Sequence, residues 1–353
     1  MHEERVLAAL PDILPEGWLA TRDPRRLLMV EEIRTGVSTN RVFRLRLDDG
    51  TSAIAKVSCF GSFVHFRQDH ERICAWIERL AGTRWARFLA PVVAREGRPC
   101  LHRDGPSWVA FYEEVERGEA LPRVLSETEI ENLATEIARF HRACLRVSGR
   151  IEPTWKTLGS DVALLRDQLD QRAWCEARSV GPASAEFLRE HCDAFLENAD
   201  ALGVHGMRCL PVLLDWNLGN FGVRRRGRRF LLFRRWDYDW FRIGPHTLDF
   251  YFLARVTSAV GDRTEFTYGV GHFFEERFAR FLRAYHAQLP LRPEDLLFLR
   301  EVYRFFLLNY VIRDGENFFQ PALCERLRRE AIELQLPALA EADFGQLRDI
   351  LAS

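Results

Sequence analysis

Polar residues that could transfer a phosphoryl group gather in one irregular stretch of the chain. The segment LLDWNLGNF (213–221) places Asp215 five residues before Asn220, and Asp237 follows seventeen residues after Asn220. Phosphoryl transfer from a nucleotide needs a group that orients the acceptor hydroxyl, oxygen ligands for Mg²⁺ and cations on the phosphates. Asp215 can accept the hydroxyl proton, while Asn220 and Asp237 offer oxygens to Mg²⁺, with Asp239 as a second candidate ligand. Because Asp and Asn also form turns, an ordinary turn is the alternative interpretation.

Lysine is almost absent from the chain, which makes the two retained lysines informative. Of 50 basic residues only Lys56 and Lys156 are lysines, and we attribute the excess of arginine mainly to codon usage. Lys56 stands in the apolar strand pattern AIAKV, where an ammonium could reach phosphates and Glu71 on the next helix could pair with it. The alternative for Lys56 is a surface lysine on an edge strand, and the alternative for Glu71 is an ordinary solvated helix residue. Lys156 has no comparable context.

The periodicity of the chain predicts two parts. Strands are expected from about Leu28, over Arg41–Leu47 and over Ser52–Val57, then a helix within 66–82 and two further strands before residue 115. After Gly118 the pattern is mainly helical and begins with the capping box Ser126-x-x-Glu129. A helical pattern is also expected over 3–10, 160–203, 272–288, 294–312, 321–335 and 343–351, and a hairpin is expected around residue 227.

The ordered set of motifs resembles the aminoglycoside phosphotransferase and choline kinase family, which is related to the protein kinases. D-W-N-L-G-N resembles the family's H-x-D-x-x-x-x-N loop from its Asp onward, and the segment from Asp237 to Asp249 resembles the one that follows it. In the first part of the chain, GVSTNRVFRL resembles the turn that covers the phosphates, AIAK the lysine strand, HERICAWI the glutamate helix and FYEEVERG the hinge. Each motif alone is weak, but their order over residues 30 to 255 is specific.

The resemblance implies an α+β, protein kinase-like fold with two lobes. Residues 1–117 would form the nucleotide-binding lobe, with a small antiparallel sheet and one helix, and 119–353 the large helical lobe, with a hinge at 112–118. It further implies Mg²⁺, ATP or GTP as the donor, and the hydroxyl of a small molecule, such as an aminoglycoside, amino alcohol or sugar, as the acceptor. The nucleotide-binding residues would be Ser38, Thr39, Asn40, Lys56, Glu71, Glu113 and Val115. Asp249 would brace the loop.

Two departures from the family pattern leave a second hypothesis open. The family's loop histidine, which mainly braces the loop, is Leu213 here, and the small residue after it is Leu214. The strand before Asp237 ends in Arg234, Arg235 and Trp236, where the family is usually apolar. The alternative is therefore a weak or inactive pseudokinase that binds nucleotide or a partner protein, and a third option is transfer of another group or action on a protein.

Composition excludes several other classes. The net charge is −1, so nucleic acid is not an expected partner, and the basic run at 224–229 is interpreted as a solvated hairpin. The chain has no P-loop, G-x-G-x-x-G, G-x-S-x-G or H-E-x-x-H motif, and its eight scattered cysteines predict free thiols. Without a signal peptide or apolar span, a cytoplasmic monomer or homodimer away from membranes is expected. Aromatic residues near 240–252 are interpreted as core.

Overall fold

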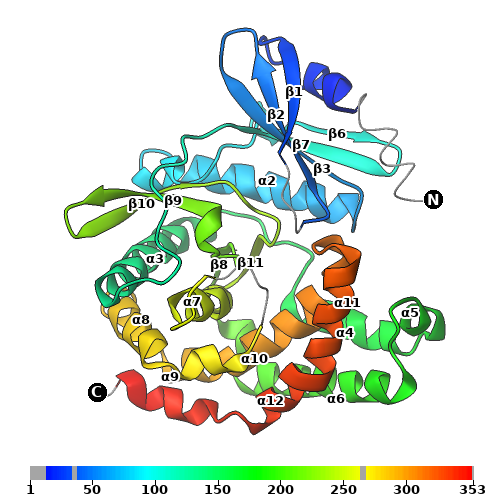
Figure 1. Cartoon of the computed structure of the whole chain (residues 1–353), viewed down its shortest axis with the longest axis vertical. Coiled ribbons are helices and arrows are strands. Elements are labelled where there is room, and N and C mark those ends of the chain that lie inside the picture. Colours follow the sequence, from blue (N-terminus) through cyan, green and yellow to red (C-terminus); the bar gives the residue numbers. More distant parts are fainter. Residues whose placement is uncertain (1–12, 34–37, 263–267, 352–353) are drawn as a thin grey trace. The chain divides into compact units, whose positions relative to one another are not determined.

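The computed structural model describes residues 13–33, 38–262 and 268–351. The chain divides into two compact units, one built from residues 1–116 and 316–323 and the other from 117–315 and 324–353 (Figure 1). The change of unit after Glu116 falls within the segment where the sequence predicts a hinge. The assignment of 316–323 to the first unit was not predicted, and the helix expected over 3–10 lies outside the described residues.

The first unit contains a five-stranded antiparallel sheet, as the sequence predicts. In spatial order the strands are β1 (Leu27–Ile33), β2 (Arg41–Leu47), β3 (Ser52–Ser58), β7 (Ser107–Glu113) and β6 (Leu101–Asp104). The first three strands pair in chain order, and a short turn at Gly50, with φ of +82°, reverses the chain between β2 and β3. A small hairpin of β4 (Ala94–Arg95) and β5 (Arg98–Pro99) precedes β6.

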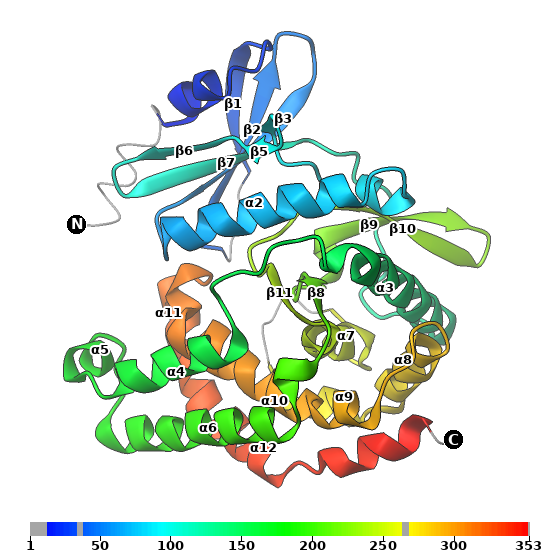
Figure 2. The same ribbon diagram turned by 180° about the vertical axis from the view of Figure 1, so that it is seen from behind.

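The two faces of this sheet are covered by different helices. One face buries Phe43, Leu45, Ala55 and Phe111 against a helical segment at 13–21. Helix α2 (Phe63–Arg79) covers the other face (Figure 2). There Phe63 and Phe66 lie beside Trp108, and the His70 ring is 2.5 Å from the Tyr112 hydroxyl. Because side chains alternate along a strand, Lys56 lies on the opposite face of the sheet from Ala55 and Val57. Lys56 is therefore on the face that α2 covers.

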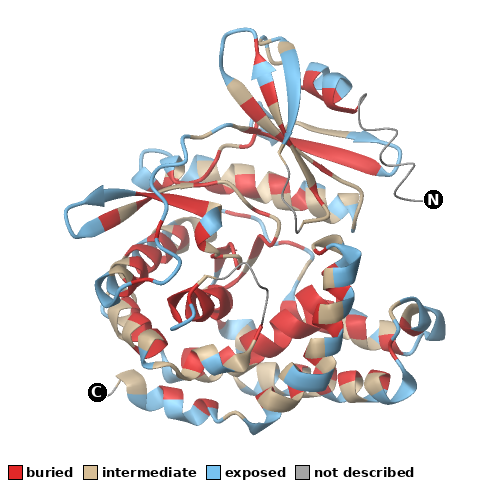
Figure 3. Cartoon of the chain, viewed as in Figure 1, coloured by how far each residue is buried: buried red, intermediate tan, exposed pale blue. Residues whose placement is uncertain are grey.

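The second unit is mainly helical. Its helices are α3 (Glu127–Ser148), α4 (Leu158–Leu169), α5 (Arg172–Ala177), α6 (Pro182–Ala201), α7 (Phe250–Thr257), α8 (Glu276–His286), α9 (Pro293–Leu297), α10 (Leu299–Phe305), most of α11 (Pro321–Glu330) and α12 (Leu336–Glu341). The predicted capping box of Ser126 and Glu129 is present at the start of α3. The long helices expected over 294–312 and 321–335 are instead composite, because π-helical turns occupy 306–313 and 331–335. Helix α7 is buried along its whole length (Figure 3).

Two short strand pairs in this unit carry the polar loop. Strand β8 (Cys209–Val212) pairs with β11 (Arg242–Pro245), and β9 (Phe221–Arg226) pairs with β10 (Arg229–Arg235). Gly227, with φ of +62°, forms the predicted hairpin turn. The Asn132 side chain exchanges two hydrogen bonds with the backbone of Phe230, and Glu136 accepts one from the Leu232 N–H. These α3 side chains satisfy the outer edge of β10 and hold the hairpin in place.

All eight cysteines are free thiols, as predicted. None of the helices that the structure describes combines the length and hydropathy needed to span a bilayer.

Candidate active site

The loop that carries Asp215 connects β8 to β9 and is held by a carboxylate from behind. Asp249 Oδ1 accepts hydrogen bonds from the backbone N–H groups of Leu213 and Leu214, at 3.1 and 2.7 Å. Leu214 has a left-handed φ of +54°, which is rare for a residue with a branched side chain and costs on the order of 1 kcal/mol. The two hydrogen bonds offset that strain, so the contacts of Asp249 are those of a loop brace.

Asp249 is itself held by helix α3. Its Oδ2 lies 2.8 Å from His141 Nε2, and His141 Nδ1 lies 2.8 Å from the Tyr285 hydroxyl. Asp249 and His141 are fully buried. A buried carboxylate needs such partners, because an unpaired charge in the interior is expensive. The brace is therefore built from α3, α8 and the start of α7, and His141 was not among the predicted site residues.

Two buried arginines hold the same loop from other directions. Arg235 Nη2 donates to the Asp215 carbonyl at 2.7 Å. Arg255 Nη1 donates to Asn217 Oδ1 at 2.5 Å and pairs with Asp262 at 3.2 Å. Asp262 in turn accepts from the Leu218 N–H at 2.6 Å. None of these loop-holding residues was among the predicted site residues, although the arginines before Asp237 were an irregularity in the strand pattern.

The half-buried Asp215 carboxyl has an unusual electrostatic environment. Burial, followed by the negative charge of Asp237, raises its pKa to about 6. The positive charges of Arg235 and Arg255 and a hydrogen bond from the Asn217 N–H act in the opposite direction. A carboxylate with a raised pKa is a better proton acceptor near neutral pH than an ordinary aspartate.

The predicted metal ligands lie next to this carboxylate in the same unit. Asn220 ends the loop, with its side-chain amide 3.5 Å from the Asp215 carbonyl, and both Asn220 and Asp237 are half-buried. Asp237 Oδ1 accepts the Asp239 N–H at 2.9 Å, so Asp239 helps to shape the turn. In the described ranges no three His, Cys, Asp or Glu side chains gather to hold a metal. One carboxylate and one amide fit Mg²⁺, which completes its shell with water and phosphate oxygens.

Lys56 occupies a central strand of the first unit. Its β3 position is flanked across the sheet by Val42 of β2 and Ala110 of β7, and its side chain is half-buried. The alternative of an edge-strand surface lysine is therefore wrong.

Two of the acidic residues of α2, Asp69 and Glu71, lie on different sides of that helix. Successive residues of an α-helix are rotated by about 100° around the helix axis, so Asp69 lies about 40° from Ile73 around that axis and Glu71 about 160° from it. Ile73 is fully buried, so Asp69 shares the inward side. The Glu71 side chain lies 3.6 Å from Arg67 and 3.7 Å from Arg72, and it is 42% exposed. The sequence pattern predicts Glu71 as the partner of Lys56, but the geometry of the helix favours Asp69.

The predicted phosphate-covering turn is held by a distant segment. Ser38 Oγ accepts the Asn40 N–H at 3.0 Å, which closes a local turn. Thr39 Oγ1 donates to the Asn317 carbonyl at 2.6 Å, and Gln320 Nε2 donates to the Ser38 carbonyl at 3.0 Å. These contacts explain why 316–323 belongs to the first unit. Residues 34–37, which include the glycine of the predicted turn, lie outside the described part.

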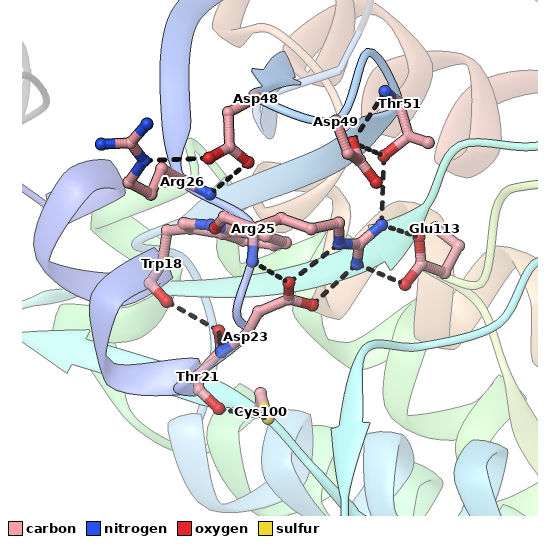
Figure 4. Close-up of polar contacts among 10 residues, drawn as sticks. All are labelled: Trp18, Thr21, Asp23, Arg25, Arg26, Asp48, Asp49, Thr51, Cys100 and Glu113. Carbon is pink, nitrogen blue, oxygen red and sulfur yellow. Dashed lines mark hydrogen bonds and ion pairs between the residues drawn. The ribbon is translucent and has the colours of Figure 1, made fainter.

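The predicted hinge begins in an ion-pair network. Arg25 donates to both Glu113 oxygens, at 2.8 and 3.1 Å, and to Asp23 at 2.7 Å (Figure 4). The Glu113 N–H donates to the Pro91 carbonyl at 2.9 Å. The side chain and N–H of Glu113 are thus engaged within the protein, and the half-buried Val115 lies two residues further on.

Comparison of the structure with solved structures identifies the fold. Amicoumacin kinase hAmiN, solved with AMP-PNP, Ca²⁺ and Ami, is 16% identical, and the match covers 98% of this chain and 100% of that one with a TM-score of 0.61. A microcompartment-associated aminopropanol kinase is 17% identical, and the match covers 90% of this chain and 94% of that one with a TM-score of 0.57. APH(2'')-IIia, solved with GDP and kanamycin, is 13% identical, and the match covers 97% of this chain and 99% of that one with a TM-score of 0.54.

The chain has the protein kinase-like fold of these small-molecule kinases. The fold class predicted from the sequence is therefore confirmed. No family model and no curated protein sequence matches the chain. At these identities the likeness establishes the fold, and the activity has to be argued from the residues of this chain.

Proposed function

We propose that this protein is a phosphotransferase that moves the γ-phosphoryl group of ATP or GTP to a hydroxyl group of a small molecule. The observation that carries this proposal is the loop from Asp215 to Asn220, held by Asp249, with Asp237 close enough to raise the pKa of Asp215. Such a cluster suits acceptor orientation beside a divalent cation.

Asp215 has the role of orienting the acceptor hydroxyl and taking its proton. Because the transition state of phosphoryl transfer is loose in most analyses, correct positioning contributes more than basicity. The braces on the loop therefore matter as much as the raised pKa of the carboxyl.

Asn220 and Asp237 are the proposed ligands of Mg²⁺, with Asp239 as a further candidate. When bound, the ion would neutralise charge on the transferred phosphoryl group. In the first unit, Lys56 holds the phosphates with Asp69 as its carboxylate partner in place of Glu71. The turn at Ser38–Asn40 covers the phosphates, and backbone groups from Glu113 to Val115 hold the base.

The neighbouring structures suggest where to search for the acceptor. One is named for aminopropanol, one was solved with kanamycin, and one is an amicoumacin kinase. Amino alcohols and amine-bearing antibiotics are thus the first candidate acceptors, followed by sugars. AMP-PNP and GDP in two of these structures support testing both ATP and GTP.

The test is an acceptor screen with the purified full chain. Nucleotide consumption is measured with ATP or GTP and Mg²⁺ against a panel of amino alcohols, aminoglycosides and sugars, and the product is identified by mass spectrometry. Asp215→Asn should lower kcat by about 100-fold or more while nucleotide affinity is retained. Asp200→Asn, an exposed change at the end of α6, is the matched control. Equal turnover by Asp215→Asn and wild type would refute the proposal.

A pseudokinase remains the second candidate because Leu213 replaces the loop histidine. Nucleotide binding that needs no metal and leads to no turnover with any acceptor would support it. A product that carries an added mass other than a phosphoryl group would instead indicate transfer of a different group.

A further inference from the structure

Arg235, the last residue of β10, is an arginine in the interior of the second unit. It is only 1% exposed, and its guanidinium lies 5.1 Å from the centre of the Trp216 ring. Trp216 is fully buried and packs against Phe140 and Phe221. The guanidinium is therefore fixed by a flat aromatic contact that is part of the core.

This burial is costly, which makes the contacts of Arg235 informative. Burial lowers the pKa of the guanidinium, while the charges of Asp215, Asp237 and Asp249 raise it. Nε and Nη1 are buried and make no hydrogen bond to the residues that the structure describes. Unsatisfied buried donors typically cost about 1–3 kcal/mol each. An apolar side chain at this position would avoid the cost of the unsatisfied donors. The one hydrogen bond that Arg235 makes within the described part of the chain, through Nη2, is therefore the contact to explain.

That hydrogen bond is made to the residue proposed to orient the acceptor. Arg235 Nη2 donates to the Asp215 carbonyl at 2.7 Å, and the amide of Asn220 reaches the same oxygen at 3.5 Å. Asp249 holds the preceding peptides, and Arg255 holds Asn217. Arg235 therefore fixes the peptide plane that follows the Asp215 side chain, at the point where the loop turns toward Asn220.

We propose that Arg235 is a positioning residue that holds the Asp215 peptide and thereby keeps the Asp215 side chain oriented toward the acceptor. The proposal rests on the proposed phosphotransferase function for its kinetic consequence. Its structural part, immobilisation of the loop by Arg235, can be tested without any substrate.

The first experiment measures hydrogen exchange of the full chain without nucleotide. We compare wild type with Arg235→Met and Arg235→Lys, and use Arg229→Met as the control, since Arg229 is an exposed arginine of the same strand. Loss of a hydrogen bond to a charged group should speed exchange about tenfold or more in peptides spanning 213–220. Arg235→Lys, which keeps the charge and can still donate to the Asp215 carbonyl, should restore part of the protection relative to Arg235→Met. Unchanged exchange in this loop, or equal acceleration throughout the second unit, would overturn the proposal.

The second experiment separates positioning from general stability. With an acceptor from the screen, Arg235→Met should lower kcat by about 100-fold while KM for the nucleotide and acceptor changes less than about twofold. Arg235→Lys should recover part of kcat, and Arg229→Met should match wild type. Parallel loss of kcat, nucleotide affinity and melting temperature, or full activity of Arg235→Met, would overturn the proposal.

These experiments also distinguish the two levels of inference. If wild type transfers no phosphoryl group but the loop exchanges faster in Arg235→Met, the proposed function fails and the loop-holding role stands. If wild type is active and Arg235→Met is unchanged in both assays, the proposed function stands and the role of Arg235 is refuted.

Discussion

Asp249 Oδ1 lies 2.7 Å from the backbone nitrogen of Leu214, 35 residues earlier in the chain. The contact links the start of the buried helix α7 to a residue with φ of +54°, directly before Asp215. A leucine in this conformation requires support from its surroundings. The loop geometry is therefore a tertiary property that short-range sequence preferences do not produce.

Removal of this brace should weaken both the loop and the whole unit. Asp249→Ala leaves the Leu213 and Leu214 N–H groups and His141 without their acceptor, so we expect unfolding free energy to fall by about 3 kcal/mol or more. Urea denaturation measures this change. The exposed Asp349→Asn should stay within about 0.5 kcal/mol of wild type. Equal stability of Asp249→Ala and wild type would contradict the role of brace.

The proposed metal ligands, Asn220 and Asp237, should be recognisable by the magnesium dependence of turnover. Asp237→Asn removes a carboxylate charge, and Asn220→Ala removes an amide oxygen, so each should raise the Mg²⁺ concentration for half-maximal activity roughly tenfold or more. Titration of turnover with Mg²⁺ gives this value, and Asp200→Asn serves as the control. If both variants keep the wild-type magnesium dependence, neither residue binds the ion.

The two lysines allow the same substitution at two positions. Lys56→Arg should lower kcat/KM by roughly 100-fold, because arginine replaces a compact ammonium with a wide planar group on a crowded central strand. Lys156→Arg should have little effect on turnover. Steady-state kinetics with ATP and GTP test this expectation. A Lys56→Arg protein with full nucleotide binding and turnover would show that Lys56 does not hold the phosphates.

Asp69 and Glu71 of α2 are the two candidate partners of Lys56, and we expect their substitutions to have different effects. We expect Asp69→Asn to lower kcat/KM about tenfold, since its side of the helix is shared with the buried Ile73. Glu71→Gln should change it less than about twofold, because Glu71 is 42% exposed beside Arg67 and Arg72. The reverse ranking would restore Glu71 as the partner that the sequence pattern predicts.

A buried ion pair in the second unit predicts a pH dependence of stability. Asp161 of α4 is 6% exposed and lies 2.5 Å from Arg242 and 3.1 Å from Arg313. Burial raises its pKa, but these arginines outweigh burial and leave it below the ordinary value. A carboxyl with a lowered pKa in the folded state stabilises fully above its unfolded pKa of about 4, and that contribution is lost as the pH falls through the folded value.

The corresponding test compares wild type with Asp161→Asn. At neutral pH the variant should lose about 3–5 kcal/mol, because Arg242 and Arg313, both buried, lose a charged carboxylate partner. The difference in unfolding free energy should stay constant from about pH 8 to 5 and shrink below about pH 4. Urea denaturation over this range measures the difference. A difference that instead grows below pH 4 would mean that the Asp161 pKa is not lowered in the folded protein.

The sequence alone predicted the features that depend on local patterns. Alternating residues and the turn at Gly50 predicted the strands around Lys56, and Ser126 with Glu129 predicted the start of α3. The order of the motifs from the phosphate-covering turn to Asp249 predicted the fold class, which the solved neighbours confirm. The strands and the helix start follow from chain periodicity and capping chemistry, which short segments carry, whereas the fold class followed from the resemblance of the ordered motifs to a known family.

Only the tertiary structure decided which side chains hold the loop and which acidic residue of α2 points inward. Arg235 reaches the Asp215 loop from β10, His141 of α3 holds the bracing Asp249, and Asn317 reaches Thr39 across 278 residues of sequence. Their positions depend on how helices and strands pack. For α2, the side of the helix that carries Ile73 becomes inward only when the helix lies on the sheet, which favours Asp69 over Glu71. Contacts between distant segments leave no periodic trace in a single sequence, which is why the braces of the candidate site emerged only from the folded chain.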